Sequence, residues 1–372
     1  MSALLVVLAV AALLLSFANG ANDTFKGVAT LHGDGTLGYR AALAWALATT
    51  LAGSFVAVLL AQTLLHAFRG KGLVPDALLA EPAFAPAVAA GAGLTVLAAS
   101  RFGFPISTTH ALVGALVGAG LAAEAPIAWG HLGNGFFLPL AVSPVLAVAL
   151  TAVAVPLLAR VVRRTPVHRA LCLCFPDREH AVVPAGTAGA VSMDAAPAGA
   201  RVSTAERCEA EGLKPAVRLA PRHLGTGLHF LSAGAVGFAR GLNDTPKIAA
   251  LLLAVPALDG RPGTTLAVCG VAMALGGLLG ARRVADTMSH RITAMRPAEA
   301  TTANLATAGL VLGASRLGVP VSTTHVSCGS LFGLGAVNGQ ARWRTIGRVL
   351  LSWVLTLPLA AALAALGWAA LG

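Results

Sequence analysis

The fold is decided by a polar stretch that the chain carries twice. Its first copy reads Ala99-Ser100-Arg101-Phe102-Gly103-Phe104-Pro105-Ile106-Ser107-Thr108-Thr109-His110. Its second copy, 215 positions later, reads Ala314-Ser315-Arg316-Leu317-Gly318-Val319-Pro320-Val321-Ser322-Thr323-Thr324-His325, and nine of the twelve residues are identical. Both copies lie between long apolar runs. Polar interruptions at matching places in two halves of a hydrophobic chain are typical of a transporter's binding site.

A second motif is duplicated at an offset of 221 residues. It reads Ala18-Asn19-Gly20-Ala21-Asn22-Asp23-Thr24-Phe25-Lys26 and returns as Ala239-Arg240-Gly241-Leu242-Asn243-Asp244-Thr245-Pro246-Lys247. The last segment of each half also opens on a matching tryptophan (Trp129, Trp343) and contains a matching proline (Pro144, Pro358). The duplication therefore spans most of the chain.

The composition predicts an all-α polytopic membrane protein. Hydrophobic residues make up 56% of the chain and charged residues only 11%, whereas a soluble domain carries about 25% charged residues. Apolar runs long enough to cross the bilayer recur along the whole sequence. The net charge of +11 is concentrated in one loop and beside the apolar runs. This placement favours the positive-inside pattern of a membrane protein over a nucleic-acid partner.

The sequence divides into a first transmembrane repeat (1–159), a basic loop (160–222) and a second repeat (223–372). Each repeat holds five apolar segments, which run 3–31, 41–65, 83–101, 105–123 and 133–159, then 226–255, 264–281, 299–316, 320–338 and 346–371. The third and fourth segments form either a re-entrant hairpin or two crossings. Both choices give an odd number of crossings per repeat, so the second repeat is expected to be inverted. Charge placement puts the loop in the cytoplasm and the N-terminus outside the plasma membrane.

The motif at 18–26 and 239–247 has the composition of a cation site. The apolar run 3–17 is too short to span the bilayer, so the polar residues after it are expected at mid-membrane, where Gly20 and Gly241 would let broken helices unwind. Unwound carbonyls and hard oxygen side chains suit a small cation. The candidate ligands are Asn22, Asp23, Thr24, Asn243, Asp244 and Thr245. Two of the four lysines, Lys26 and Lys247, either balance these aspartates or contact the ligand.

The motif at 99–110 and 314–325 predicts an anion site. A proline turn followed by an apolar helix places hydroxyl groups on the first helical turn, beside free N–H groups and the positive end of the helix dipole. The candidate residues are Ser107, Thr108, Thr109, Ser322, Thr323 and Thr324, with His110 and His325 in support. N-capping is the structural alternative for such hydroxyls. Asp23 or Asp244 could accept the hydrogen bond that a protonated phosphate donates.

At these motifs the chain resembles the inorganic phosphate transporter (PiT) family. The resemblance implies a phosphate symporter built as an inverted repeat, usually a homodimer, coupled to Na⁺ or H⁺ and without a cofactor or a further metal. It also implies that the Ser-Thr-Thr triplets hold phosphate and that the Asn-Asp pairs hold the cation. The family pattern carries membrane glutamates, whereas this chain has Thr49, Thr50, Gln62 and Asn304 in those regions. Fewer carboxylates leave sodium, protons and a neutral metal–phosphate substrate as alternatives.

Two further functional hypotheses come from the same residues. Sulfate or another tetrahedral oxyanion would satisfy the same donor groups. An intramembrane hydrolase would use Ser107 or Ser322 with a histidine, but catalysis requires one activated nucleophile rather than two equivalent copies. A channel would need repeated rings around one axis. The sequence therefore favours a secondary transporter over an enzyme.

Overall fold

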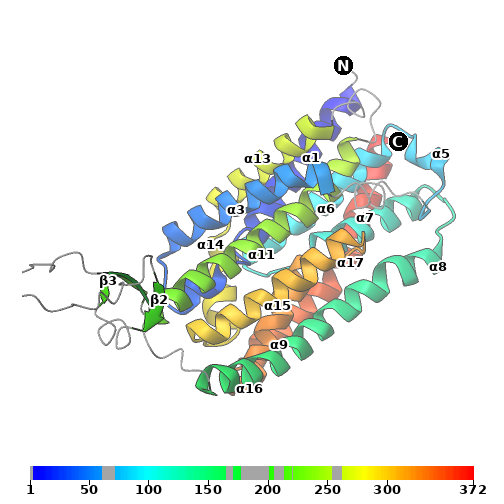
Figure 1. Cartoon of the computed structure of the whole chain (residues 1–372). Helices are drawn as coiled ribbons and strands as arrows, with labels where there is room; N and C mark the ends of the chain where they lie inside the picture. The colour runs from blue at the N-terminus through cyan, green and yellow to red at the C-terminus, as the bar shows by residue number, and fades with distance from the viewer. Residues whose placement is uncertain are drawn as a thin grey trace, which may run out of the picture. The chain divides into compact units, whose positions relative to one another are not determined.

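The computed structural model describes residues 3–60, 72–164, 171–176, 201–204, 213–219, 221–253 and 262–372 (Figure 1). The helices of the first half are α1 (Ala3–Asp23), α2 (Ala29–Gly33), α3 (Tyr39–Leu60), α5 (Asp76–Leu79), α6 (Phe84–Phe102), α7 (Thr108–Ala122), α8 (Trp129–His131), the π-helical η1 (Leu132–Phe137) and α9 (Leu138–Arg164). Those of the second half are α11 (Pro221–Leu252), α13 (Pro262–Gly280), α14 (Arg282–Asp286), the π-helical η2 (Thr287–Arg291), α15 (Pro297–Arg316), α16 (Thr323–Asn338) and α17 (Trp343–Leu371).

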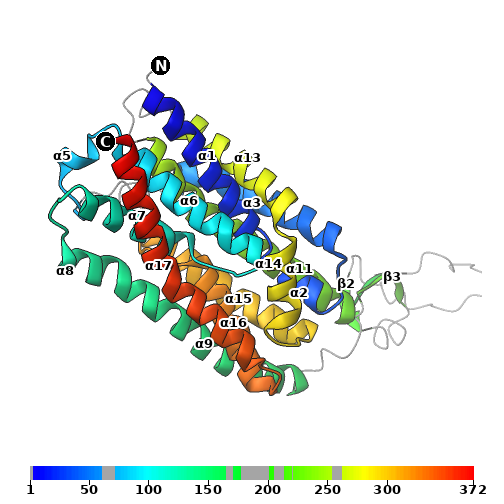
Figure 2. The ribbon, with the colours of Figure 1, turned by 180° about the vertical axis from the view of Figure 1, so that it is seen from behind.

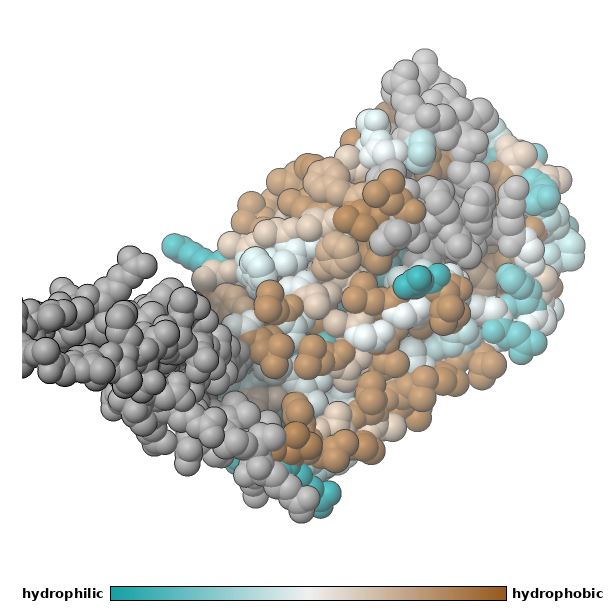
Figure 3. Space-filling model, viewed as in Figure 1, coloured by the Kyte–Doolittle hydropathy of each residue, from teal (hydrophilic) through white to brown (hydrophobic). Residues whose placement is uncertain are grey.

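The expectation of an all-α membrane protein is confirmed. Six helical stretches in the described residues are long and apolar enough to cross a bilayer, namely Ala3–Asp23, Tyr39–Ala57, Phe84–Phe102, Trp129–Val161, Pro262–Gly280 and Trp343–Leu371. Large apolar side chains such as Val145, Val153, Val354 and Leu366 are more than half exposed. Figure 3 shows such hydrophobic residues spread over the helices. A surface of this kind is suited to contact with lipid rather than water.

The long helices α9 and α17, which carry the matching Trp and Pro residues, run in opposite directions. Figures 1 and 2 show α9 running away from the end that holds α8, whereas α17 runs back toward that end and to the C-terminus. α6 pairs with α7, and α15 pairs with α16, as two helical hairpins. With 15 and 16 residues, α7 and α16 are about 22–24 Å long. Each is therefore shorter than the ~30 Å hydrocarbon core.

The expected unwinding at Gly20 and Gly241 is wrong. Both glycines lie inside regular helix, since α1 ends only at Asp23 and α11 continues without a break to Leu252. The first helix is interrupted after the aspartate, by the turn 24–28 that precedes α2. The glycines serve close packing instead, because an added Cβ would lie 1.9 Å from the Met273 carbonyl oxygen at Gly20 and 2.1 Å from that of Thr50 at Gly241.

The two halves pack as one compact unit, residues 1–156 and 229–372, and residues 157–228 form a second unit. The second unit contains an antiparallel sheet that the sequence did not predict. Its strands are β1 (Leu171–Pro176), β2 (Arg201–Thr204) and β3 (Leu213–Leu219), in the order β2-β1-β3. In the first unit, α1 packs between α6 and α13, and α17 packs on α6 and α7. This arrangement places both duplicated motifs in the interior.

Candidate substrate and ion site

The two serines of the duplicated turns are N-caps. The Ser107 hydroxyl accepts a hydrogen bond from the His110 amide, and the Ser322 hydroxyl accepts one from the His325 amide, each at 3.1 Å. Such caps satisfy one of the free N–H groups at a helix start. The structural alternative therefore describes these two serines in this conformation. The threonines that follow each cap are left to make other contacts.

The tips of the two hairpins meet through reciprocal hydrogen bonds. The Thr324 hydroxyl donates to the Ile106 carbonyl oxygen at 2.6 Å, and the Thr109 hydroxyl donates to that of Val321 at 3.4 Å. Each turn therefore contacts the first helical turn of the other half. The sequence predicted two donor-rich turns, and the structure brings them together.

The two motif histidines lie against each other. The His110 and His325 ring centroids are 4.4 Å apart, and the His325 ring stacks on Trp353 of α17 at 3.9 Å. The Trp353 indole N–H donates to the Pro105 carbonyl oxygen at 2.9 Å. The two histidines thus pack with Trp353, which is itself hydrogen-bonded to the first hairpin turn.

Asp23 and Lys26 form a buried ion pair with Nζ and Oδ1 2.6 Å apart. The Lys26 ammonium also donates to the hydroxyls of Thr324 and, at 3.4 Å, of Thr323. The Thr108 hydroxyl lies 3.5 Å from the other Asp23 oxygen. The first aspartate motif therefore contacts hairpin residues from both halves.

The second aspartate motif makes related contacts. The Lys247 ammonium lies 3.5 Å from Asp244 Oδ1 and donates to the Thr109 hydroxyl at 2.9 Å and to the Val321 carbonyl oxygen at 2.7 Å. The Thr323 hydroxyl donates to Asp244 Oδ2 at 3.1 Å. Each lysine thus joins its own aspartate to a hairpin of the opposite half.

The two asparagines hold the hairpins rather than an open cation position. The Asn22 side chain donates to the Phe104 carbonyl oxygen at 2.9 Å and accepts from the Ile106 amide at 3.1 Å. The Asn243 amide oxygen accepts from Ser315 at 3.2 Å. The Thr245 hydroxyl is paired with Ser54 at 2.7 Å. Four polar groups of the candidate cation ligands therefore already have hydrogen-bond partners within the protein.

Arg240 is a functional candidate that the sequence analysis missed. Its side chain is 1% exposed, and it donates to the Asn19 side-chain oxygen at 2.6 Å and to the hydroxyls of Thr24 and Thr50. Its Nε lies 3.8 Å from Asp244. Asn19 occupies the equivalent position in the first copy of this motif. A signal was present, because a charged residue replaced a neutral one at a single position inside a duplicated apolar segment.

The central cluster carries an excess of positive charge. It contains two carboxylates, Asp23 and Asp244, and three cationic groups, Lys26, Lys247 and Arg240, all 3% exposed or less. With every group ionised its net charge is +1. A buried charge is costly unless it is paired. The cluster as built therefore lacks one negative charge.

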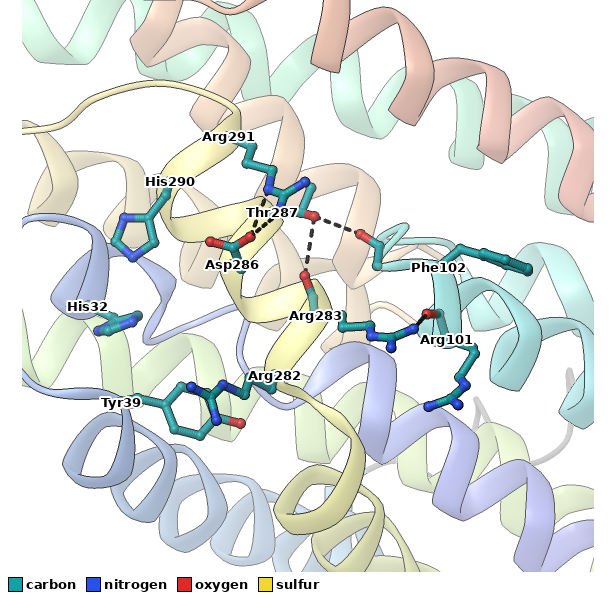
Figure 4. A pocket seen from close by; sticks show the side chains of 11 residues that line it. His32, Tyr39, Arg101, Phe102, Arg282, Arg283, Asp286, Thr287, His290 and Arg291 are labelled. Atoms are coloured by element: carbon teal, nitrogen blue, oxygen red, sulfur yellow. Dashed lines mark hydrogen bonds and ion pairs between the residues drawn. The ribbon is translucent and has the colours of Figure 1, made fainter.

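A basic cavity of about 850 Å³ lies beside the first hairpin turn (Figure 4). Four arginines line it, namely Arg101, Arg282, Arg283 and Arg291. His32, His290 and the carboxylate of Asp286 complete its charged and titratable lining. Arg291 pairs with Asp286 at 2.5 Å, and the Arg282 guanidinium lies 6.0 Å from the centre of the Tyr39 ring. The electrostatic character of this cavity favours anions.

A second cavity of about 330 Å³ shares Arg101, Arg282 and Arg283 with the first and reaches Ser100. The Ser100 hydroxyl accepts a hydrogen bond from Asn22 at 3.0 Å. The two cavities therefore extend from the basic surface to the edge of the first aspartate motif.

Two hydrogen bonds from the wall of this cavity, together called the latch, hold the first hairpin turn in place. The Arg283 guanidinium donates to the Arg101 carbonyl oxygen, and the Thr287 hydroxyl donates to that of Gly103 at 2.8 Å. Both donors belong to the continuous segment of α14 and η2. Movement of the turn away from this segment would break both hydrogen bonds.

Comparisons with known proteins agree on one family. The sequence profile of the phosphate transporter family matches residues 19–364. A probable low-affinity inorganic phosphate transporter of Rhizobium meliloti is 29% identical over 378 residues, which cover 98% of this chain and 95% of that protein. One from Mycobacterium tuberculosis is 28% identical over 370 residues, covering 96% of this chain and 75% of that protein.

A solved structure described as the sodium-dependent phosphate transporter shares the fold. Its TM-score is 0.77 at 22% sequence identity, and the match covers 100% of this chain and 99% of that one. The likeness extends over both halves and both hairpins.

Proposed function

Because the chain belongs to the phosphate transporter family, we propose that it imports inorganic phosphate across the plasma membrane by cation-coupled symport. It is a transporter and not an enzyme. The observation that carries the proposal is the buried cluster of net charge +1 at the junction of the two hairpin turns. A phosphate monoanion would bring this cluster to neutrality.

The substrate site comprises hydroxyl and cationic donors from both halves. Thr108, Thr109, Thr323 and Thr324 would exchange their present partners for phosphate oxygens. The ammonium groups of Lys26 and Lys247 already contact three of these threonines, so an anion bound here would also meet cationic donors. Charge-assisted hydrogen bonds of this kind are about twice as strong as neutral ones. Ser107 and Ser322 contribute by capping the helices that present these threonines.

Phosphate fits this site better than sulfate for a specific reason. Asp23 and Asp244 face the threonines, and a carboxylate there accepts the hydrogen bond that protonated phosphate still donates. Sulfate carries no proton near neutral pH and meets the carboxylates with like charge. Its two negative charges would also overcompensate the cluster.

Alternating access between two inverted repeats supplies the transport step. The opposite directions of α9 and α17 support this topology (Figure 2), as does the placement of both hairpin tips in one interior site. In this scheme the N-terminus lies outside, the basic loop lies in the cytoplasm, and the arginine-lined cavity is the inner vestibule. The chain acts as a homodimer in the lipid bilayer, without a cofactor, and its coupling ion is Na⁺ or H⁺.

The test is radiolabelled phosphate uptake into proteoliposomes, with sodium and proton gradients imposed separately and sulfate as competitor. Uptake driven by either gradient and insensitive to excess sulfate is the expected result. Gradient-driven sulfate accumulation without phosphate uptake would assign the site to the other anion. A neutral metal–phosphate substrate would instead make uptake depend on an added divalent cation.

A further inference from the structure

The two motif lysines have the surroundings of bound metal cations. The contacts of Lys26 Nζ include oxygens of Asp23, Thr323 and Thr324. Those of Lys247 Nζ include oxygens of Asp244, Thr109 and Val321. One carboxylate together with hydroxyl and carbonyl oxygens is the set that a small hard cation selects in a protein. Each ammonium therefore lies where such oxygens converge.

We propose that the ammonium groups of Lys26 and Lys247 are the fixed cations of this site, occupying the places that sodium ions would otherwise take. Phosphate transport by this chain accordingly does not require sodium. The inference rests on the proposed function, because it specifies how the cationic charge of a phosphate symport site is supplied.

The charge of the cluster supports this assignment. Lys26, Lys247 and Arg240 already exceed the two aspartates by one charge, and all five side chains are buried. A sodium ion bound at Asp23 or Asp244 would raise the excess to two charges in a region shielded from water. Like charges that lack solvent screening repel strongly. Sodium would therefore have to displace an ammonium that is covalently attached.

The remaining oxygen ligands are also occupied. The Asn22 side-chain oxygen accepts from the Ile106 amide, and the Asn243 side-chain oxygen accepts from Ser315. The Thr24 hydroxyl accepts from Arg240 at 3.3 Å. Each ligand expected for a free cation thus already has a partner within the protein. With the tethered ammonium groups in place, these oxygens already have their polar partners and do not require a metal ion.

A purely local role would leave different contacts. A lysine that only neutralises the aspartate three residues before it needs no contact outside its own helix or turn. Lys26 instead reaches the start of α16, and Lys247 reaches the start of α7. Each ammonium joins a carboxylate of one half to a threonine of the other. Closing the two halves around the site is what a coupling cation does in a symporter.

The experiment compares phosphate/phosphate exchange in proteoliposomes containing either sodium or potassium at equal ionic strength. Exchange needs no driving gradient, so it separates the ion requirement from coupling. We expect wild-type rates in the two salts to agree within about twofold, as ionic screening alone predicts. In the Lys26→Met/Lys247→Met variant, the emptied positions should accept sodium, making exchange about tenfold faster in sodium than in potassium.

Two further variants control for charge and for lysine removal. Lys26→Arg retains the positive charge and should keep exchange insensitive to sodium. Lys214→Met removes a lysine from β3, in the second unit, and should match the wild type in both salts. Sodium-specific thermal stabilisation of the purified double variant, absent from the wild type, provides a readout that does not depend on transport.

The outcomes separate the two proposals. Wild-type exchange that occurs only in sodium would overturn the ammonium assignment while leaving the phosphate transporter intact. So would a double variant whose exchange and thermal stability remain equal in the two salts. Failure of phosphate exchange in every salt, with correctly folded wild-type protein, would instead overturn the proposed function.

Discussion

Replacement of Gly20 by alanine tests whether this residue allows unwinding or close packing. An added Cβ would lie 1.9 Å from the Met273 carbonyl oxygen, whereas ordinary contact begins at 3.4 Å. The obstacle is backbone on α13, so no side chain can rotate away. α1 and α13 would have to separate by about 1.5 Å along this contact, and overpacking of this kind costs about 1–3 kcal/mol or more. Gly20→Ala should therefore destabilise the protein.

Gly309→Ala is the matched control. Gly309 lies inside α15 and has no heavy atom within 4 Å of an added Cβ, so alanine should stabilise this helix by about 0.5–1 kcal/mol. Thermal unfolding in detergent should give a lower midpoint for Gly20→Ala and an equal or higher one for Gly309→Ala. A Gly20→Ala protein as stable as its control would refute the packing explanation. The remaining explanation for Gly20 would then be local unwinding of the helix.

Three other predictions concern charge and hydrogen bonding. Arg240→Asn introduces the residue that the first copy of the motif has at the equivalent position. It should raise the KM for phosphate by about 10- to 100-fold, since a charge-assisted donor contributes about 1.5–3 kcal/mol. An unchanged KM would show that Arg240 is not part of the site. Thr287→Val removes the hydrogen bond to Gly103, so amide hydrogen exchange in the turn 103–107 should accelerate by up to about tenfold. Unaltered exchange would show that this hydrogen bond does not hold the turn in place. Burial alone would raise the pKa of Asp34, but hydrogen bonds from His229 and Thr36 outweigh it and lower that pKa below 3.8. The stabilisation from Asp34 is therefore present above its unfolded pKa and lost as the pH falls through the folded one, so Asp34→Asn should lower the unfolding midpoint at pH 7 and have little effect in strong acid.

The duplication allows the candidate site to be predicted from sequence, because residues that recur inside apolar segments have few reasons to be polar. The Ser-Thr-Thr turns and the Asn-Asp pairs do meet, as their repetition indicated. Their partners could not be predicted. Lys26 contacts Thr324, almost 300 residues away in the chain, and such pairings depend on the angles between packed helices, which hydrophobic patterns do not encode.

Other features were missed for identifiable reasons. The backbone freedom of glycine predicts unwinding at Gly20, but a helix inside a membrane protein uses glycine equally for close approach to a neighbour. Arg240 could not be found from the identities between the two copies of its motif, because it is their one charged difference. The strands of the central segment were missed because they are short and carry no clear alternation of apolar residues.

In the proposed alternating-access scheme, differences between the halves would determine which conformation the carrier prefers at rest. Contacts that recur in both repeats, such as the serine caps at Ser107 and Ser322, would stabilise two inverted conformations equally and favour neither. The latch of Arg283 and Thr287 acts on the first hairpin turn. A bias of about 1–3 kcal/mol from these two hydrogen bonds would favour the latched conformation by roughly 5- to 150-fold. Phosphate shifts this balance only through a difference in its affinity for the two conformations. Weakening the latch should therefore alter the rate at which the empty carrier reorients more than it alters phosphate affinity, and comparison of net uptake with exchange in Thr287→Val measures that difference directly.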